Sequence, residues 1–352
     1  MNIPKSVTRI NTNPVGGCSS LTSLTVEEGN TRYDSRDNCN AIIETYSNTL
    51  IGGCKNTIIP NSVTSIGGGA FSGCGLTAIT IPNSVIRIGE GAFGSCGGLT
   101  SITIPNSVTS IDRGAFEGCS GLTSIAIPNS VTSLGYDVFN GCSALESIEV
   151  DSNNAVYDSR ENCNGIIETA GNKLVVGCKN TIIPSSVTTI GDAAFHNCSG
   201  LTAITIPDGV TTLEGSSFSW CTGLTSVSIP NSVTSIGIWA FYGCGSLKEV
   251  ISHIEEPFEI SKGAFGGYFF DDQWVEFTTA TLYVPIGTKA KYEATPAWNL
   301  FQNIVEKDYS SINEMVQPLG TASPVIYNLS GQKLTAPKKG INIINGQKVV
   351  VK

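Results

Sequence analysis

The sequence predicts a β-solenoid, mainly β with short helical or 3-10 turns, in which strands from successive turns form one long curved parallel sheet. Proline recurs at steps of 22 or 23 residues within two groups, and each proline is followed by a Phe and, three residues later, by a Cys. A fixed period in the twenties is typical of a solenoid, whose turns stack only on their neighbours. The three columns are Pro60, Pro82, Pro105, Pro128, Pro184, Pro207 and Pro230; Phe71, Phe93, Phe116, Phe139, Phe195, Phe218 and Phe241; and Cys74, Cys96, Cys119, Cys142, Cys198, Cys221 and Cys244.

The segment before each proline is the predicted strand. Residues 99–104, with the sequence LTSITI, fit the L-x-x-L-x-L pattern of leucine-rich repeats. Because strand side chains alternate, we expect the three apolar residues to point inward and the three polar residues outward. The far side of the same coil would be filled by Val108, Ile111, Ala115 and Phe116. The pattern therefore predicts a leucine-rich-repeat solenoid with a spine of Phe rings behind its sheet.

The sequence motifs within the repeat are themselves informative. Residues 104–125 contain IPNSVTSI, GAFEGC and LTSI, and this combination of motifs resembles the BspA-like leucine-rich repeats of bacterial cell-surface proteins. The resemblance covers residues 1–306, with local departures at Val15, where Phe is expected, and at Asp151 and His253, where Pro is expected. It implies surface display and binding of host or neighbouring-cell molecules without catalysis.

Composition restricts the class of partner. The 352 residues carry a net charge of −9, which argues against nucleic acid, since nucleic-acid binding needs clustered Lys and Arg. The same charge disfavours anionic lipid surfaces. No run of about 20 apolar residues is present, so no membrane span is predicted. The partners that the resemblance implies are host or bacterial surface proteins or glycoproteins, and glycans remain an alternative.

The first residues, from Asn2 to Ile10, are already in the middle of a repeat, without a polar cap or a signal peptide. Since the resemblance implies an extracellular or outer-surface protein, we expect that an export signal and a capping segment have been removed or lie outside this sequence. A cytosolic protein with a poor first turn is the alternative.

Twelve cysteines raise the question of disulfides. Cysteines that recur once per turn are expected to stack as buried thiols, because parallel side chains usually miss disulfide geometry. Cys39 with Cys54 and Cys163 with Cys178 are the alternative bridges, since each pair brackets the same predicted hairpin. Zinc has no support, because there is no C-x-x-C pair and the sequence contains two His residues. No cofactor is expected.

The sequence also contains a longer repeat, in addition to the repeat of 22 or 23 residues. Residues 33–45 recur as residues 157–169, at an offset of 124, and each copy leads into a second apolar run. We interpret these as β-hairpins in elongated units at about 26–59 and 150–183. The Asp- and Asn-rich loop at 34–40 could bind calcium. Asx turns around Arg36 and Arg160 explain it without a metal.

After residue 244 the pattern loosens into a C-terminal lid at about 282–306. Thr288 is the predicted N-cap of a short helix, and Thr295-Pro296 the predicted start of another. Residues 307–323 are a predicted linker, and 324–352 alternate like strands, with a turn signal at Asn345-Gly346. This tail is similar to short C-terminal sorting modules of exported bacterial proteins. A plain β-hairpin appendage is the alternative.

The sequence offers little for catalysis. Residues 89–94 match G-x-G-x-x-G by letter, but they form the repeat's Gly-Ala-Phe turn rather than opening a helix. His196 is expected on the convex surface, and His253 is expected to be structural or solvent-facing, with no partner for either evident from the sequence. Buried thiols would be inert. We therefore predict that the chain is not an enzyme.

The outward face of the strands is the predicted binding surface, because solenoids bind along such faces. Our leading hypothesis is an adhesin-like module; the alternatives are glycan capture for nutrient uptake and a structural spacer that displays another module. The tentative face residues are Thr100, Ser101, Thr103, Thr123, Ser124, Glu146, Glu149, Thr202, Thr205, Thr225, Ser226 and Ser228. The edge aromatics that glycan capture would use are Trp220, Trp239, Tyr242 and Trp274.

Overall fold

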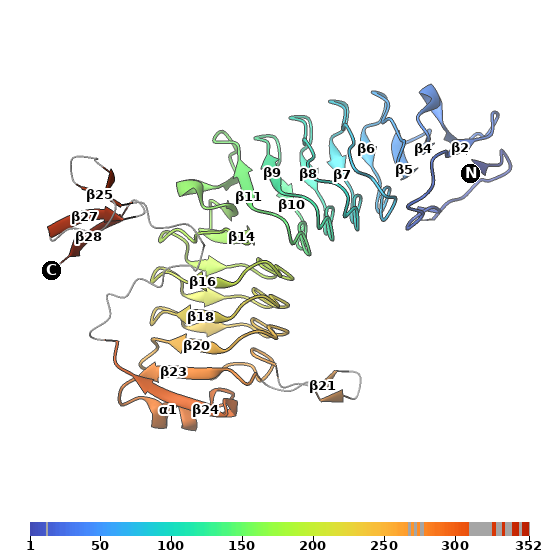
Figure 1. Cartoon of the computed structure of the whole chain (residues 1–352). Helices are drawn as coiled ribbons and strands as arrows, with labels where there is room; N and C mark the ends of the chain where they lie inside the picture. The colour runs from blue at the N-terminus through green and yellow to red at the C-terminus, as the bar shows by residue number, and fades with distance from the viewer. Residues whose placement is uncertain are drawn as a thin grey trace. The chain divides into compact units, whose positions relative to one another are not determined.

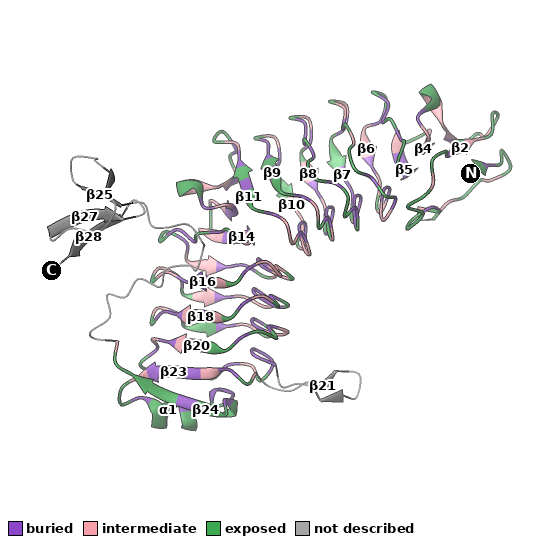
Figure 2. Ribbon diagram, viewed as in Figure 1, coloured by how far each residue is buried: buried purple, intermediate pink, exposed green. Residues whose placement is uncertain are grey.

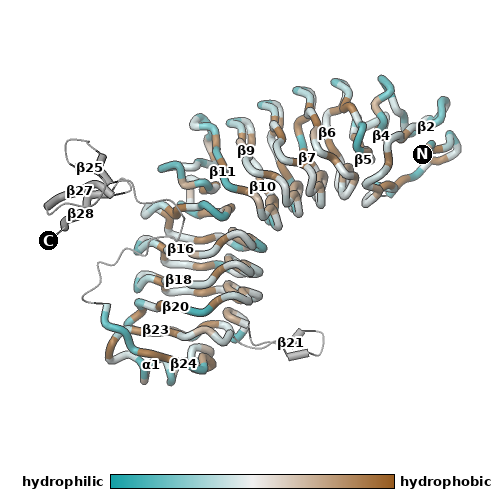
Figure 3. The backbone as a smooth tube through the Cα atoms, in the orientation of Figure 1, coloured by the Kyte–Doolittle hydropathy of each residue, from teal (hydrophilic) through white to brown (hydrophobic). Residues whose placement is uncertain are grey.

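The computed structural model describes residues 1–11, 13–266 and 278–309, together with the backbone of six further short strands. The chain forms two compact units, residues 1–311 and 312–352. The first unit is a β-solenoid in which strands of successive turns pair in parallel (Figure 1). This confirms the predicted solenoid class. Buried and exposed segments alternate within each turn (Figure 2), and hydrophobic residues recur from turn to turn (Figure 3), as the repeat requires.

Each turn has two straight segments, and these build two ladders. The long-strand ladder lies before the proline positions. It comprises β9 (Ser124–Ile127) paired with β11 (Ser147–Val150), and a five-stranded parallel sheet of β16 (Ala203–Thr205), β18 (Ser226–Ile229), β20 (Glu249–Ser252), β23 (Thr281–Pro285) and β24 (Asn303–Lys307).

The short-strand ladder follows the prolines and is built from two-residue strands. Its members are β6 (Ser65–Ile66), β7 (Arg87–Ile88), β8 (Ser110–Ile111) and β10 (Ser133–Leu134), then β15 (Thr189–Ile190), β17 (Thr212–Leu213) and β19 (Ser235–Ile236). Near the N-terminus, β1 (Asn2–Ile3) pairs with β2 (Thr25–Val26). The expectation of one long sheet was therefore wrong, because the second straight segment of each turn builds its own ladder and the hairpin units divide both ladders.

The elongated units each contain an antiparallel hairpin with a bulge. In the first, β3 (Tyr33–Asp34) and the 3-10 turn η1 (Arg36–Asn38) precede β4 (Ala41–Glu44) and β5 (Thr49–Gly53). In the second, β12 (Tyr157–Asp158) and η2 (Arg160–Asn162) precede β13 (Gly165–Glu168) and β14 (Lys173–Gly177). The last hairpin strand of each unit pairs in parallel with the next short strand, so the hairpin extends the short-strand ladder.

In the acidic loop of each hairpin unit, an arginine side chain pairs with the aspartate carboxylate. The Arg36 guanidinium lies 2.6 Å from Asp34 and donates to the Asn48 side-chain oxygen at 2.9 Å. The Asp34 carboxylate also accepts from the Arg36 backbone N–H at 3.1 Å, which is an Asx turn. Arg160 repeats these contacts with Asp158 and Asn172. The Asp34 and Asp158 carboxylates, which were considered as calcium ligands, therefore accept hydrogen bonds from groups of their own loops.

The Phe rings form the core spine that the sequence predicts. Stacked neighbours lie 5.3 Å apart at Phe71–Phe93 and 5.2 Å apart at Phe218–Phe241, with nearly parallel planes. The spine is interrupted at the second hairpin, where Gly177 lies against the Phe195 ring. A glycine is needed there because a Cβ would come within 2.1 Å of that ring.

All twelve cysteines are free thiols, and ten of them are buried. Where the turns stack regularly, each thiol donates to the carbonyl oxygen of the Phe one turn earlier. The S···O distance is 3.1 Å from Cys96 to Phe71 and 3.2 Å from Cys119 to Phe93. A small buried donor at this position therefore satisfies a carbonyl group of the adjacent turn.

The end of the solenoid core is covered by α1 (Lys289–Ala294) and η3 (Trp298–Leu300), with Tyr292 and Trp298 fully buried. Thr288 precedes α1, but its hydroxyl donates to the Pro285 carbonyl at 2.7 Å instead of capping the helix. The second predicted start was wrong. Thr295 ends α1, and η3 begins at Trp298 after Ala297, because Ala297 takes the left-handed conformation at φ 68°.

The remaining strands are described by backbone alone. In the first unit β21 (Phe269–Phe270) pairs antiparallel with β22 (Gln273–Trp274). The second unit is a four-stranded antiparallel sheet of β25 (Ile326–Asn328), β26 (Lys333–Leu334), β27 (Gly340–Ile344) and β28 (Gln347–Val351), in the order β26-β25-β27-β28. The predicted turn at Asn345-Gly346 and most of the predicted linker lie outside the described residues.

Candidate functional site: the outward face of the long-strand ladder

The outward side chains of β16, β18, β20, β23 and β24 form a continuous surface, which we call the strand face. Burial alternates along each strand, so Val227 and Ile229 face the core while Ser226 and Ser228 face outward. The parallel register then aligns outward residues from turn to turn. One such row runs through Thr205, Ser228, Ile251, Tyr283 and Val305.

The sequence-predicted face residues divide into two groups. Ser226 and Ser228 on β18 and Thr205 on β16 belong to the strand face, with Thr202 and Thr225 just before these strands. Ser124 on β9 and Glu149 on β11 belong to the separate two-stranded sheet, with Thr123 and Glu146 just before its strands. Thr100, Ser101 and Thr103 are exposed as predicted, but they lie outside any strand. The structure therefore does not join all twelve residues in one sheet.

Several of these side chains already have partners. The Thr225 hydroxyl donates to the Thr202 carbonyl at 3.1 Å, and that of Thr123 to the Thr100 carbonyl at 3.4 Å. These threonines thus help to tie one turn to the next while they keep oxygen lone pairs on the surface. Glu146 lies 2.9 Å from the Lys179 ammonium, which offsets part of the acidity expected there.

Large side chains enter the strand face at its C-terminal end. We call Ser228, His253, Tyr283, Lys307 and Tyr309 the terminal cluster. His253 Nε2 is hydrogen-bonded to the Ser228 hydroxyl at 3.1 Å, and its ring lies 4.4 Å from that of Tyr309. The Lys307 ammonium lies 5.6 Å from the centre of the Tyr283 ring, within cation–π range.

Burial governs the protonation of this cluster. It lowers the pKa of His253, with Lys307 acting in the same direction and Asp208 opposing it, so the imidazole is neutral at pH 7. Burial also raises the pKa of Tyr309 to about 12, so its hydroxyl keeps its proton. That hydroxyl oxygen is buried and has no hydrogen-bond partner among the residues that the structure describes. The cluster therefore combines one cation with neutral hydrogen-bonding groups and aromatic rings.

Sequence reasoning missed the terminal cluster. The alternation in residues 281–285 could have placed Tyr283 on the outward face. Lys307 and Tyr309 were assigned to the linker, although β24 extends to Lys307. Ile58 and Ile182, equivalent residues of the two hairpin units, were also missed: each is 74% exposed at the outward position two residues before the proline. The break in the Thr/Ser pattern was the available signal.

The edge aromatics lie in the turns that carry the Phe spine rather than on the long strands. Trp220 is 47% exposed and Trp239 is 37% exposed. The Tyr242 ring meets that of Trp220 edge-on, at 5.4 Å between centres. The Trp274 side chain lies outside the described residues. The structure thus groups these residues by turn position and separates them from the strand face.

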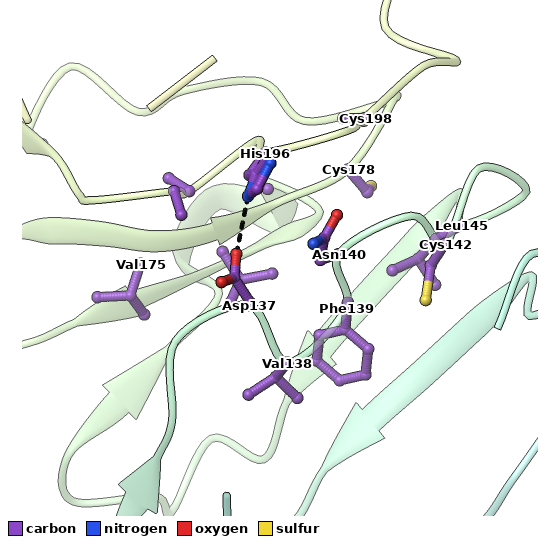
Figure 4. A pocket seen from close by; sticks show the side chains of 14 residues that line it. Asp137, Val138, Phe139, Asn140, Cys142, Leu145, Val175, Cys178, His196 and Cys198 are labelled. Carbon is purple, nitrogen blue, oxygen red and sulfur yellow. Dashed lines mark hydrogen bonds and ion pairs between the residues drawn. The ribbon is translucent and has the colours of Figure 1, made fainter. Parts of the chain in front are cut away.

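A small cavity of about 20 Å³ lies where the spine is interrupted (Figure 4). His196 Nδ1 is 3.0 Å from Asp137 Oδ1 at this point, so His196 is a partnered, half-buried residue rather than the surface residue we expected. Burial raises the pKa of both Cys142 and Cys198 to about 12, so these thiols are not activated nucleophiles. The cavity has room for about one water molecule, and it offers no site for a substrate.

The comparisons with known proteins agree with this architecture. The model of the BspA type leucine rich repeat region matches residues 42–165 and 173–270, in six copies. The chain belongs to the BspA-type leucine-rich repeat family. A search of curated proteins found no match to this BspA-type chain.

Two solved structures extend the comparison. A leucine-rich cell surface protein from Faecalibacterium prausnitzii A2-165 is 25% identical with a TM-score of 0.56, and the alignment covers 88% of this chain and 79% of that one. The pneumococcal vaccine antigen PcpA shares the fold at 16% identity and a TM-score of 0.51, with 87% and 78% covered. BspA-type solenoids of this kind are typically non-catalytic, and the family suggests a binding role at the cell surface. Among the described residues, no helix has the length and apolar character needed to cross a membrane.

Proposed function

We propose that this chain is an exported cell-surface binding protein, adhesin-like and without catalytic activity, that recognises a protein or glycoprotein of a host or neighbouring cell. The binding surface is the strand face. The observation that carries the proposal is the unbroken register from β16 to β24, which ends in the terminal cluster.

The composition of the face supports this use. Small hydroxyl side chains on β16 and β18 leave a flat surface on which a partner can approach the strands closely. Protein interfaces usually depend on a few aromatic or basic anchors surrounded by weaker contacts. Tyr283 and Lys307 are such anchors, since both belong to the outward side of the last two strands.

The proposal is tested by a binding screen of the full chain against matrix proteins, plasma proteins and mucins, followed by two strand-face variants. Thr205→Lys places a long charged side chain in the row, and Tyr283→Ala removes an anchor. Loss of an anchor residue is expected to weaken binding by about 30-fold or more. The matched control is Thr211→Lys, since Thr211 is also an exposed threonine but precedes the short strand β17.

Saturable binding that both face variants lose and the control keeps would support the proposal. Binding that survives both face variants would place the site elsewhere on the solenoid. Absence of binding by correctly folded protein would favour a spacer that displays another module.

A further inference from the structure

The turns that carry the Phe spine have two positions with left-handed backbone, one two residues before the Phe and one two residues after it. Glycine holds both in the turns of Phe71 and Phe116, at Gly69, Gly73, Gly114 and Gly118, with φ between 57° and 69°. Glycine is the residue expected there, because a side chain makes this conformation strained.

In the second half of the solenoid, a tryptophan occupies the position after the Phe in one turn and the position before the Phe in the next. Trp220, two residues after Phe218, has φ 57°, and Trp239, two residues before Phe241, has φ 61°. Neither indole is buried in the core, since 47% and 37% of these residues remain exposed. The other residues that replace glycine at these positions are small or short, namely Ser95, Asp137, Ala193, Asn197 and Ser216, so tryptophan is the bulky exception at both positions. Strain retained at an exposed aromatic residue points to a function.

Each indole lies against a glycine at the equivalent position of the next turn. A Cβ on Gly243 would come within 2.8 Å of the Trp220 ring, and one on Gly263 within 3.0 Å of the Trp239 ring. Gly263 does not have a positive φ, and its lack of a side chain lets the Trp239 indole pack closely against the next turn. The rings are thus held in place before any ligand arrives, which lowers the entropy cost of binding.

We propose that Trp220, Trp239 and Tyr242, here called the indole surface, bind a neutral glycan by stacking on its sugar rings. A pyranose ring has a face of C–H groups, which suits an indole, and a rim of hydroxyl groups, which needs polar neighbours. Asn197 and Ser216 hold the equivalent turn positions one turn before Trp220 and Trp239, so a polar side chain is next in line to each indole. The net charge of −9 disfavours an acidic glycan.

The polar surroundings favour a glycan over an apolar protein surface. Among the described residues, Asn197 and Ser216 hold the equivalent positions one turn earlier, the exposed Lys262 precedes Gly263, and Ile238 beside Trp239 is 49% exposed. This site is separate from the strand face and does not depend on the function proposed for it.

The test uses the full chain on an array of neutral hexose and N-acetylhexosamine oligosaccharides, with indole fluorescence titration of each hit. The variants are Trp220→Gly and Trp239→Gly, because glycine holds the equivalent positions in other turns, such as Gly118 and Gly114, and we therefore expect the fold to be retained. We expect each to weaken glycan binding by at least about tenfold. Tyr46→Ser is the matched control, since Tyr46 is an aromatic residue that is 98% exposed in the first hairpin loop.

Thr205→Lys on the strand face should leave glycan binding unchanged, which separates this test from that of the proposed function. The inference is overturned if folded protein binds no glycan on the array, or if both Trp variants bind as wild type does. Loss of a protein partner in the Trp variants, with no glycan bound, would identify a protein interface instead.

Discussion

Substitution of Gly177 tests how the Phe spine is packed where the second hairpin interrupts it. Replacing it by alanine adds a Cβ that would lie 2.1 Å from Phe195 Cε1 and 2.4 Å from Cζ. Neither partner can easily retreat. The Gly177 N–H donates to the Ala194 carbonyl at 2.8 Å, and the Phe195 ring is stacked at 4.9 Å on that of Phe218.

The cost follows from this geometry. The closest contact must lengthen from 2.1 Å to at least 3.4 Å before it becomes an ordinary van der Waals contact. Overpacking of a rigid core typically costs 1–3 kcal/mol, and the displacement here is large, so we expect Gly177→Ala to lower the free energy of unfolding by about 3 kcal/mol. Gly53→Ala should behave alike, because its Cβ would lie 2.1 Å from Phe71 Cε1.

The measurement is urea denaturation followed by tryptophan fluorescence. The matched control is Gly245→Ala, whose Cβ would have nothing within 4 Å and whose φ is not positive. We expect this control to change stability by no more than about 1 kcal/mol. Adding Phe195→Leu to Gly177→Ala should recover part of the loss, as a coupled pair does. The reasoning is refuted if Gly177→Ala unfolds at the same urea concentration as the control.

Two further predictions concern titratable groups. At pH 8 we expect the exposed Cys18 to react rapidly with a thiol reagent in the native protein, while Cys39 and Cys119, whose pKa values burial raises to about 11 and about 12, react only after unfolding. Twelve thiols should titrate in denaturant without reductant, whereas eight would indicate the two hairpin disulfides. Because burial lowers the pKa of His253 below its ordinary 6.5, the unfolded chain binds this proton more readily. The resulting stabilisation is complete above pH 6.5 and is lost as the pH falls through the lower pKa of the folded state. Denaturation from pH 7.5 to 5 should therefore show a steeper loss in wild type than in His253→Gln, and parallel curves would contradict the assignment.

Much of the solenoid could be predicted because its core and surface positions depend on short-range sequence patterns. Phe116 is fully buried, and Thr100 and Thr103 are exposed, as strand alternation and the repeat period require. The second ladder was missed for a related reason. Two-residue strands such as β8 are too short to show an alternating pattern, and only pairing between turns defines them.

The terminal cluster, by contrast, depends on the order in which turns stack. Ser228, His253, Tyr283 and Lys307 belong to four strands or strand ends, and the irregular spacing after residue 244 hides which of them are neighbours. The register that aligns Ile251 with Tyr283, and Pro285 with Lys307, brings them together. A hydrogen bond such as that from Ser228 to His253 exists only once this register is set.

The sequence by itself therefore determined the coil, its Phe spine and the inward or outward direction of its strand residues, because these follow from a period of 22 or 23 residues and from strand alternation. The tertiary structure alone decided the contacts between turns: the pairing of His196 with Asp137, the indole of Trp220 against Gly243, and the terminal cluster. Such contacts join residues 23 to 59 positions apart, and their geometry depends on backbone conformation and register, which no local pattern encodes.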